Sequence, residues 1–293
     1  MKVEYQNSTG LLAVIGDPIA HSLSPLLQNT MIKALERDDL YLAFRVEKGG
    51  LPEFLAASKA LHIDGFNLTM PHKEDILPFL DSCTPEAKRC GSVNTVRRRD
   101  GRLEGHCTDG LGFRRSLWDL GLDFPKKCVT ILGAGGAARA IAMTAVDSGA
   151  KQVAVVNRTL SKAEAICAGE QNMLALERSR VEEIMPETDI LINTTPVGME
   201  GVAGTGQYGF LRSLKPGAAA VDCIYAPPVT PFLAAAKALG HPTANGLGML
   251  IYQAVYAYAF FRELEFSEET VTRLGKLLRE AYHRQEKKQI ENM

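Results

Sequence analysis

The sequence VTILGAGGAA, residues 129–138, decides the fold of this chain. Its first four residues are mostly apolar, which predicts a buried parallel strand. The strand ends in a G-x-G-x-x-A pattern formed by Gly133, Gly135 and Ala138, the dinucleotide-binding fingerprint with alanine in its last position. Gly133 permits a tight turn, Gly135 lets the backbone approach a pyrophosphate, and Ala138 keeps the next helix close to the strand.

The residues on both sides of this turn favour a cofactor site over a purely structural glycine turn. A helix of small apolar residues is expected over 137–146, and a second strand over 152–156. The helix begins with free N–H groups and the positive end of its dipole, which stabilise phosphate. We therefore expect a dinucleotide to bind along Gly133, Ala134, Gly135, Gly136 and Ala137.

The end of the second strand predicts which dinucleotide binds. A site for NAD places an acidic residue there, to accept hydrogen bonds from the ribose 2′-hydroxyl. This chain has Asn157, Arg158 and Thr159 instead, with Lys162 close behind. A guanidinium pairs with a 2′-phosphate and an ammonium adds positive charge, so NADP(H) is the expected cofactor. The alternative is that Arg158 and Lys162 are ordinary solvated charges at a helix start.

The composition excludes several classes of protein. A net charge of −1 over 293 residues gives no electrostatic signature of nucleic-acid or anionic-membrane binding. No apolar run spans a bilayer, since the longest candidate, residues 249–261, is interrupted by Gln253. The first ten residues lack the apolar segment of a signal peptide. We therefore expect a cytoplasmic protein whose six dispersed cysteines are reduced and bind no zinc.

Strand and helix patterns alternate along the chain, which predicts an α/β fold with two domains. The NADP-binding, Rossmann-type domain is expected over residues 114–248. Residues 1–113 form the other domain, in which Ser24 is expected to cap a helix that begins at Pro25. The apolar face of the last helix must cover something, so residues 249–293 are expected to return to this first domain. Ligands would then bind in a cleft between the two domains.

Polar residues follow the expected strands of the first domain, where ligands bind in α/β proteins. These segments are residues 21–24, 67–73, 92–95 and 108–110. The histidines at positions 21, 72 and 106 show no metal-ligand spacing, so we expect them to be hydrogen-bonded or solvent-facing.

Taken in order, these segments resemble the shikimate dehydrogenase family. The resemblance spans about residues 12–255 and rests on motifs of the types S-x-S, N-x-T-x-P-x-K, G-A-V-N-T and T-D-G, followed by the glycine turn, N-R-T, N-x-T-P-x-G-M and N-G-x-G-M-L-x-x-Q-A. Three positions depart from the family pattern. Ser92 replaces the usual alanine, Cys107 stands where asparagine usually precedes T-D-G, and Lys162 stands where a second arginine is common.

The resemblance implies the reversible, NADPH-dependent reduction of 3-dehydroshikimate to shikimate, in aromatic amino-acid and chorismate biosynthesis. Hydride transfer to a ketone builds negative charge on its oxygen, so a cation or an acid must meet that oxygen. The family assigns this role to Lys73, which Asp109 would pair with and orient. A carboxylate neighbour raises a lysine pKa and burial lowers it, so a general acid and a fixed positive charge both stay open.

The remaining site residues are also implied by the resemblance. Ser22 and Ser24 would bind the substrate carboxylate, and Tyr225 would line the same cleft. The ring hydroxyls would be bound by Thr69, Asn94, Asp109 and Gln253; a glutamine inside so apolar a helix needs a polar partner. The nicotinamide would lie near Gly246 and Met249, and its ribose near Thr194 and Val197.

Two other functions are compatible with the same residues. One is a quinate/shikimate dehydrogenase that prefers NAD, and the other is a sensor that binds shikimate without catalysis. The presence of both Lys73 and Asp109 favours an enzyme over a sensor. We expect a small-molecule substrate, no nucleic-acid or membrane partner, no metal, and a monomer or homodimer.

Overall fold

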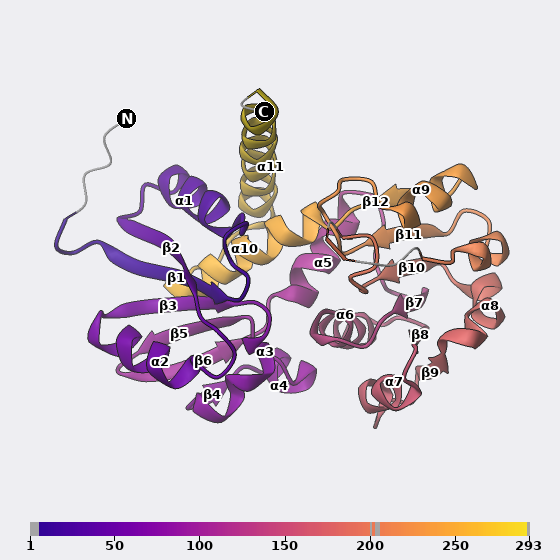
Figure 1. The fold of residues 1–293 in the computed structure, drawn as a ribbon, viewed down its shortest axis with the longest axis horizontal. Helices are drawn as coiled ribbons and strands as arrows, with labels where there is room; N and C mark the ends of the chain where they lie inside the picture. The colour runs from indigo at the N-terminus through magenta and orange to yellow at the C-terminus, as the bar shows by residue number, and fades with distance from the viewer. Residues whose placement is uncertain (1–5, 200, 203–205, 292–293) are drawn as a thin grey trace. The chain divides into compact units, whose positions relative to one another are not determined.

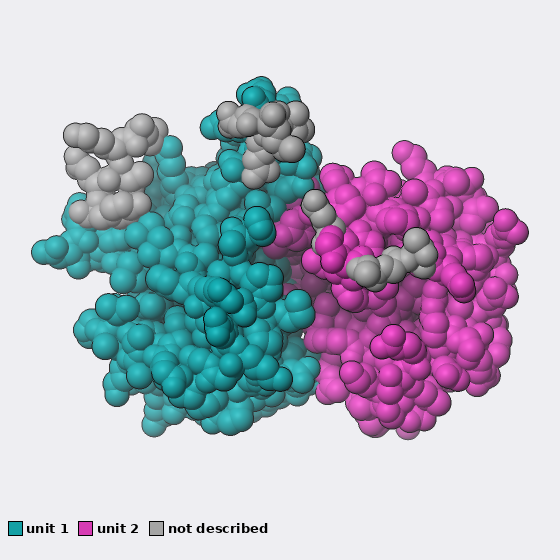
Figure 2. Space-filling model, viewed as in Figure 1, with its two compact units in different colours: residues 1–108, 251–293 teal, residues 109–250 magenta. Residues whose placement is uncertain are grey.

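The computed structural model describes residues 6–199, 201–202 and 206–291. The prediction that the first ten residues form no signal peptide falls partly outside these ranges, because residues 1–5 are not described. The chain divides into two compact units (Figure 2). The first unit comprises residues 1–108 and 251–293, and the second comprises residues 109–250. The sequence places the divisions at 113/114 and 248/249, whereas the contacts place them at 108/109 and 250/251.

The second unit is built on a six-stranded sheet in the order β12-β11-β10-β7-β8-β9 (Figure 1), and every neighbouring pair is parallel. Counted along the chain from β7, this is the 3-2-1-4-5-6 order of a doubly wound dinucleotide-binding fold. The strand order reverses between β7 and β10. The strands are β7 (Cys128–Leu132), β8 (Gln152–Asn157), β9 (Met173–Glu177), β10 (Ile190–Asn193), β11 (Ala219–Asp222) and β12 (Thr243–Ala244).

Helices of the second unit pack on the faces of this sheet. Helix α6 contacts β7 and β8, α7 contacts β8 and β9, and α9 contacts β11. One core cluster includes Leu132, Phe210 and Phe232, all nearly inaccessible to solvent. The helices are α5 (Asp109–Trp118), α6 (Gly136–Asp147), α7 (Leu160–Cys167), α8 (Val181–Ile184) and α9 (Pro231–Ala238).

The first unit contains a mixed sheet in the order β2-β1-β3-β5-β6-β4. Strand β1 pairs in parallel with β2 and β3, whereas β5 runs antiparallel to both β3 and β6. Residues 12–16 of β1 are buried in the core of this unit. The strands are β1 (Gly10–Gly16), β2 (Asp39–Arg45), β3 (Ile63–Leu68), β4 (Ser82–Cys83), β5 (Thr95–Arg99) and β6 (Arg102–His106).

The two C-terminal helices contribute to the first unit. Helix α11 packs beside α1, and residues 251–262 of α10 belong to this unit. Near the end of α10, Arg262 forms ion pairs with Asp39 and Asp64, and the Tyr258 hydroxyl donates to Asp39 at 2.6 Å. These contacts fasten α10 to the beginning of β2 and to β3. The helices are α1 (Ser24–Ala34), α2 (Leu51–Ala60), α3 (His72–Asp75), α4 (Pro85–Cys90), α10 (Leu247–Arg262) and α11 (Glu268–Glu291).

Strand β2 lies at the edge of the first sheet among the described residues, and a side chain from α1 covers part of that edge. The Asn29 amide accepts a hydrogen bond from the Tyr41 N–H at 2.9 Å and donates to the Tyr41 carbonyl at 2.8 Å. A third bond runs from the same amide to the Pro25 carbonyl within α1.

The α/β class is confirmed, but the start of the first helix differs from its prediction. Helix α1 begins at Ser24, and the capping position is Leu23, whose side chain makes no cap bond. Leu23 already has helical backbone angles (φ −84°, ψ −6°), so the helix starts earlier than expected. No helix in the described part of the chain combines the length and apolarity needed to cross a bilayer.

Candidate functional site

One end of the first unit's sheet brings together three of the polar segments expected from the sequence, residues 67–73, 92–95 and 108–110. The carboxyl end of β3 lies beside the amino end of β5, because the two strands are antiparallel, and β6 ends next to them. In this register Asn67 faces Thr95, and Thr95 faces His106. Segments far apart in sequence therefore meet at one end of the sheet.

Ser22 and Ser24 lie at the beginning of α1, after the loop that follows β1. Both side chains are half-buried, and the Ser22 hydroxyl accepts a hydrogen bond from the Ser24 N–H at 3.3 Å. The amino end of α1 adds the positive end of a helix dipole. This corner can bind an anionic group such as a carboxylate.

Thr69 and Lys73 follow β3. The Thr69 N–H donates to the Ile15 carbonyl at 3.0 Å, which ties the end of β3 to the end of β1. Lys73 lies in the short helix α3, and its carbonyl accepts the Val93 N–H at 2.8 Å. The main chain of Lys73 is therefore bound to the residue directly before Asn94.

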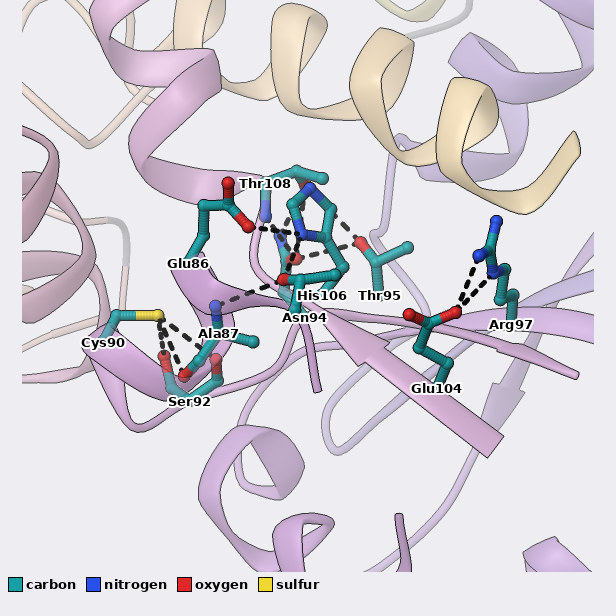
Figure 3. A network of polar contacts seen from close by, with 11 residues as sticks. Glu86, Ala87, Cys90, Ser92, Asn94, Thr95, Arg97, Glu104, His106 and Thr108 are labelled. Carbon is teal, nitrogen blue, oxygen red and sulfur yellow. Dashed lines mark hydrogen bonds and ion pairs between the residues drawn. The ribbon is translucent and has the colours of Figure 1, made fainter. Parts of the chain in front are cut away.

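Asn94 lies within a dense group of hydrogen bonds at the amino end of β5 (Figure 3). Its Oδ1 accepts from the Thr108 N–H and from the Thr95 hydroxyl, each at 2.9 Å. Its Nδ2 donates to the Thr108 hydroxyl at 3.0 Å. Asn94 is only 2% exposed, so its side chain is held in one orientation by the protein itself.

The three histidines considered as metal ligands, at positions 21, 72 and 106, are hydrogen-bonded or exposed. His72 is buried and its Nε2 donates to the Val46 carbonyl at 2.7 Å, whereas His21 is exposed. His106 stacks on Phe260 with ring centroids 4.8 Å apart, and burial lowers its pKa although Glu86 and Glu104 favour the charged form. Within the described ranges, no group of three or more His, Cys, Asp or Glu side chains is arranged to hold a metal ion.

The glycine turn of the second unit connects β7 to α6. Gly133 has φ +109°, a left-handed backbone, and a Cβ there would lie 2.5 Å from Thr194 Oγ1. Gly135 is different, because a Cβ there would meet no described atom within 4 Å. Packing within the protein therefore requires glycine at position 133 and leaves position 135 open. An open backbone at the amino end of α6 fits a bound pyrophosphate.

The turn lies where the strand order reverses, and Thr194 closes it from the other side. The Thr194 hydroxyl donates to the Leu132 carbonyl at 2.7 Å, which joins the ends of β10 and β7. In an open α/β sheet this reversal is where ligands bind.

Directly before Thr194 in the chain, the Asn193 amide donates to the Asp222 carboxylate at 3.0 Å. The Thr230 hydroxyl donates to the same carboxylate at 2.6 Å. Burial raises the pKa of Asp222, and these donors oppose the rise. Burial also raises the pKa of Tyr225, which follows β11. Asp222 therefore serves to hold the ends of β10 and β11 in place.

The end of β8 presents basic groups to solvent. Asn157 is half-buried and its amide donates to the Thr159 carbonyl at 3.0 Å. Arg158 and Lys162 are exposed at the start of α7. Residues 157–160 contain no carboxylate, so this strand end suits a 2′-phosphate better than a bare ribose hydroxyl.

Three further residues expected at the cofactor belong to the second unit: Gly246 and Met249, expected near the nicotinamide, and Val197, expected near its ribose. For Gly246 the structure supplies a packing reason, since a Cβ would overlap the Cys223 carbonyl oxygen. Glycine at this position is thus required by the fold of the second unit alone.

The expected substrate residues are divided between the units. The first unit holds Ser22, Ser24, Thr69, Lys73, Asn94 and Gln253, and the second holds Asp109 and Tyr225. The pairing of Lys73 with Asp109 stays a prediction. Three residues that the sequence did not identify, Tyr41, Asn67 and Thr95, connect directly to Asn94 or to its hydrogen-bond partners. Asn67 and Thr95 lie within the motifs at residues 67–73 and 92–95, and their place in these motifs could have indicated a role at the site.

Comparison with known families supports this reading of both units. Residues 14–96 match the model of the shikimate dehydrogenase substrate-binding domain, and residues 119–199 match that of shikimate/quinate 5-dehydrogenase. The two matches fall on the two units described above.

Individual relatives agree. The shikimate dehydrogenase (NADP(+)) of Desulfitobacterium hafniense is 46% identical over 258 residues, covering 86% of this chain and 92% of the relative. The shikimate 5-dehydrogenase of Thermus thermophilus, solved with NADP(H) and shikimate, has a TM-score of 0.81 at 34% identity, covering 93% and 99% of the chains. The Listeria monocytogenes shikimate 5-dehydrogenase, solved with shikimate and NAD, has a TM-score of 0.84 at 33% identity, covering 95% and 99%. The resemblance seen in the sequence is confirmed: this chain belongs to the shikimate dehydrogenase family.

Proposed function

We propose that this protein catalyses the NADP-dependent, reversible reduction of 3-dehydroshikimate to shikimate. The observation that carries the proposal is that polar residues of three family motifs, Asn67, Asn94 and Thr108, meet at one end of the first unit's sheet in a buried hydrogen-bond network. The basic end of β8 and the open glycine turn support NADP(H) as the cofactor.

Each of the expected site residues has a defined task in this proposal. When bound, NADPH supplies the hydride. The Lys73 ammonium meets the carbonyl oxygen, on which negative charge grows as the bond to carbon forms, and Asp109 orients that ammonium. Ser22 and Ser24 hold the substrate carboxylate at the start of α1. Thr69, Asn94 and Gln253 bind the ring hydroxyls, and Arg158 with Lys162 binds the 2′-phosphate.

A matrix of steady-state rates tests the proposal. Shikimate and quinate are each oxidised with NADP and with NAD, and we expect the highest kcat/KM for shikimate with NADP. A higher value for quinate with NAD would instead identify a quinate/shikimate dehydrogenase. Shikimate binding without any cofactor reduction would identify a sensor. We expect the protein to act in the cytoplasm as a monomer or homodimer, and sedimentation of the purified protein tests the oligomeric state.

A further inference from the structure

Thr95 is a fully buried residue at the amino end of β5, and its hydroxyl lies at the centre of a hydrogen-bond chain. The Asn67 amide nitrogen lies 2.9 Å from Thr95 Oγ1, and Asn94 Oδ1 also lies 2.9 Å from it. On the far side of Asn67, the Tyr41 hydroxyl lies 2.6 Å from Asn67 Oδ1. The chain therefore runs from β2 through β3 to β5.

The direction of every bond in this chain is fixed by main-chain groups that can only donate or only accept. Asn67 Nδ2 also reaches the Asn94 carbonyl at 2.9 Å, so the amide nitrogen must face β5 and its oxygen must face Tyr41. Burial raises the pKa of Tyr41 well above its usual value, so the phenol keeps its proton and donates. Thr95 Oγ1 accepts from Asn67, which leaves its own proton for Asn94 Oδ1.

The same reasoning fixes Asn94. The Thr108 N–H donates to Asn94 Oδ1, so the amide oxygen must point toward Thr108 and Thr95, as Figure 3 shows. The amide nitrogen then donates to the Thr108 hydroxyl at 3.0 Å, and the oxygen of that hydroxyl also lies 3.2 Å from Asn94 Oδ1. Thr108 directly precedes Asp109, the first residue of α5.

We infer that Thr95 is a positioning residue for substrate binding: its hydroxyl holds the Asn94 amide in one orientation. The inference rests on the proposed function, because that function assigns Asn94 to the substrate. Thr95 itself need not touch the substrate. Its contribution is to remove rotational freedom from Asn94 before the substrate arrives, which lowers the cost of binding.

The test replaces Thr95 with valine, which has nearly the same shape and no hydroxyl. In Thr95→Val, Asn67 Nδ2 and Asn94 Oδ1 each lose a buried partner, so we expect KM for shikimate to rise about tenfold. KM for NADP should stay at the wild-type value, because the second unit is untouched. Thr95→Ser restores the hydroxyl and should return KM for shikimate to nearly the wild-type value.

A matched control separates positioning from a general loss of stability. Thr130 in β7 is also buried, and its hydroxyl lies 2.7 Å from that of Thr188. Thr130→Val should lower Tm without changing KM for shikimate. An equal rise of KM in Thr130→Val, or an unchanged KM in Thr95→Val, would overturn the inference.

Tyr41→Phe serves if Thr95→Val does not fold. It removes one hydroxyl at the far end of the chain and should raise KM for shikimate by a smaller factor; an unchanged KM there would also overturn the inference. If the wild-type protein does not oxidise shikimate, both the proposed function and the inference are wrong. Normal wild-type turnover with unchanged variants would remove only the inference.

Discussion

In the first unit, the residue expected to bind substrate hydroxyls at β5, Asn94, is held by side chains that are themselves buried, such as Thr95 and Thr108. In the second unit, the groups expected to meet the cofactor are main-chain amides of an open glycine turn and two exposed cations. The first arrangement couples binding to the packing of the core. The second uses backbone and solvent-facing charge, so changes there should alter affinity with little effect on folding.

The largest expected effect is on the proposed chemistry itself. Lys73→Ala removes the cation that meets the carbonyl oxygen, so we expect kcat to fall by about a hundredfold or more with a modest change in KM. Lys59→Ala in α2, an exposed lysine of the same unit, is the control and should leave kcat unchanged. A wild-type kcat in Lys73→Ala would remove Lys73 from the mechanism.

The next effect tests the exposed charge of the second unit. Arg158→Ala removes a charge-assisted contact to the 2′-phosphate, so we expect KM for NADP to rise on the order of tenfold or more, and KM for NAD to change far less. Tm should not change, because Arg158 is exposed. Arg212→Ala is the control, since this exposed arginine lies in the short helical turn before β11. Equal losses for both dinucleotides would refute the phosphate role.

Two glycines of the second unit should respond in opposite ways. At Gly135 an added Cβ meets no described atom, so Gly135→Ala should keep Tm and raise KM for NADP by about tenfold. At Gly246 a Cβ would overlap the Cys223 carbonyl, so Gly246→Ala should lower Tm by several degrees, as expected for about 1–3 kcal/mol of overpacking.

Gly209→Ala is the matched control for Gly135→Ala. A Cβ at this position also meets no described atom, and Gly209 lies outside the glycine turn. Both Tm and KM for NADP should be unchanged in this variant. A weakened affinity in Gly209→Ala, or a normal one in Gly135→Ala, would contradict the assignment of the turn to the pyrophosphate.

The smallest effect is a pH dependence of the first unit. Burial lowers the pKa of His106, so the unfolded chain takes up a proton at a higher pH than the folded chain does. The contribution of neutral His106 to the free energy of unfolding is therefore complete above about pH 6.5, the pKa of an unfolded histidine. This contribution declines as the pH falls from that value to the lower pKa that His106 has in the folded protein. Tm measured at pH 8 and pH 5 should fall less in His106→Gln than in the wild type. An identical fall in both proteins would contradict this linkage.

The sequence was sufficient for features whose cause is local. The turn after β7 was identified because its glycines and the flanking apolar segments are adjacent in the chain. The basic end of β8 was identified for the same reason. The cap of α1 was misassigned because serine before proline is a typical helix start, whereas the backbone of Leu23 had already entered the helical region.

Features that depend on distant partners could not be predicted. Strand β5 contains Arg97, Arg98 and Arg99, which gives no apolar alternation. Arg97 is accommodated because it lies 4.5 Å over the Phe260 ring and pairs with Glu104. The role inferred for Thr95 was hidden likewise, since Asn67 and Asn94 meet it only after β3 and β5 have paired.

The Asn29 amide, bound to both main-chain groups of Tyr41, acts as a one-residue substitute for a neighbouring strand. An uncovered edge invites strands from other molecules to add on, and native proteins block such edges by several means. Leu42 and Phe44 are exposed on this same strand, so an uncovered edge would also offer apolar side chains to another molecule. We therefore expect that replacing Asn29 would cause the protein to self-associate during expression and concentration, before any change in catalysis is detected.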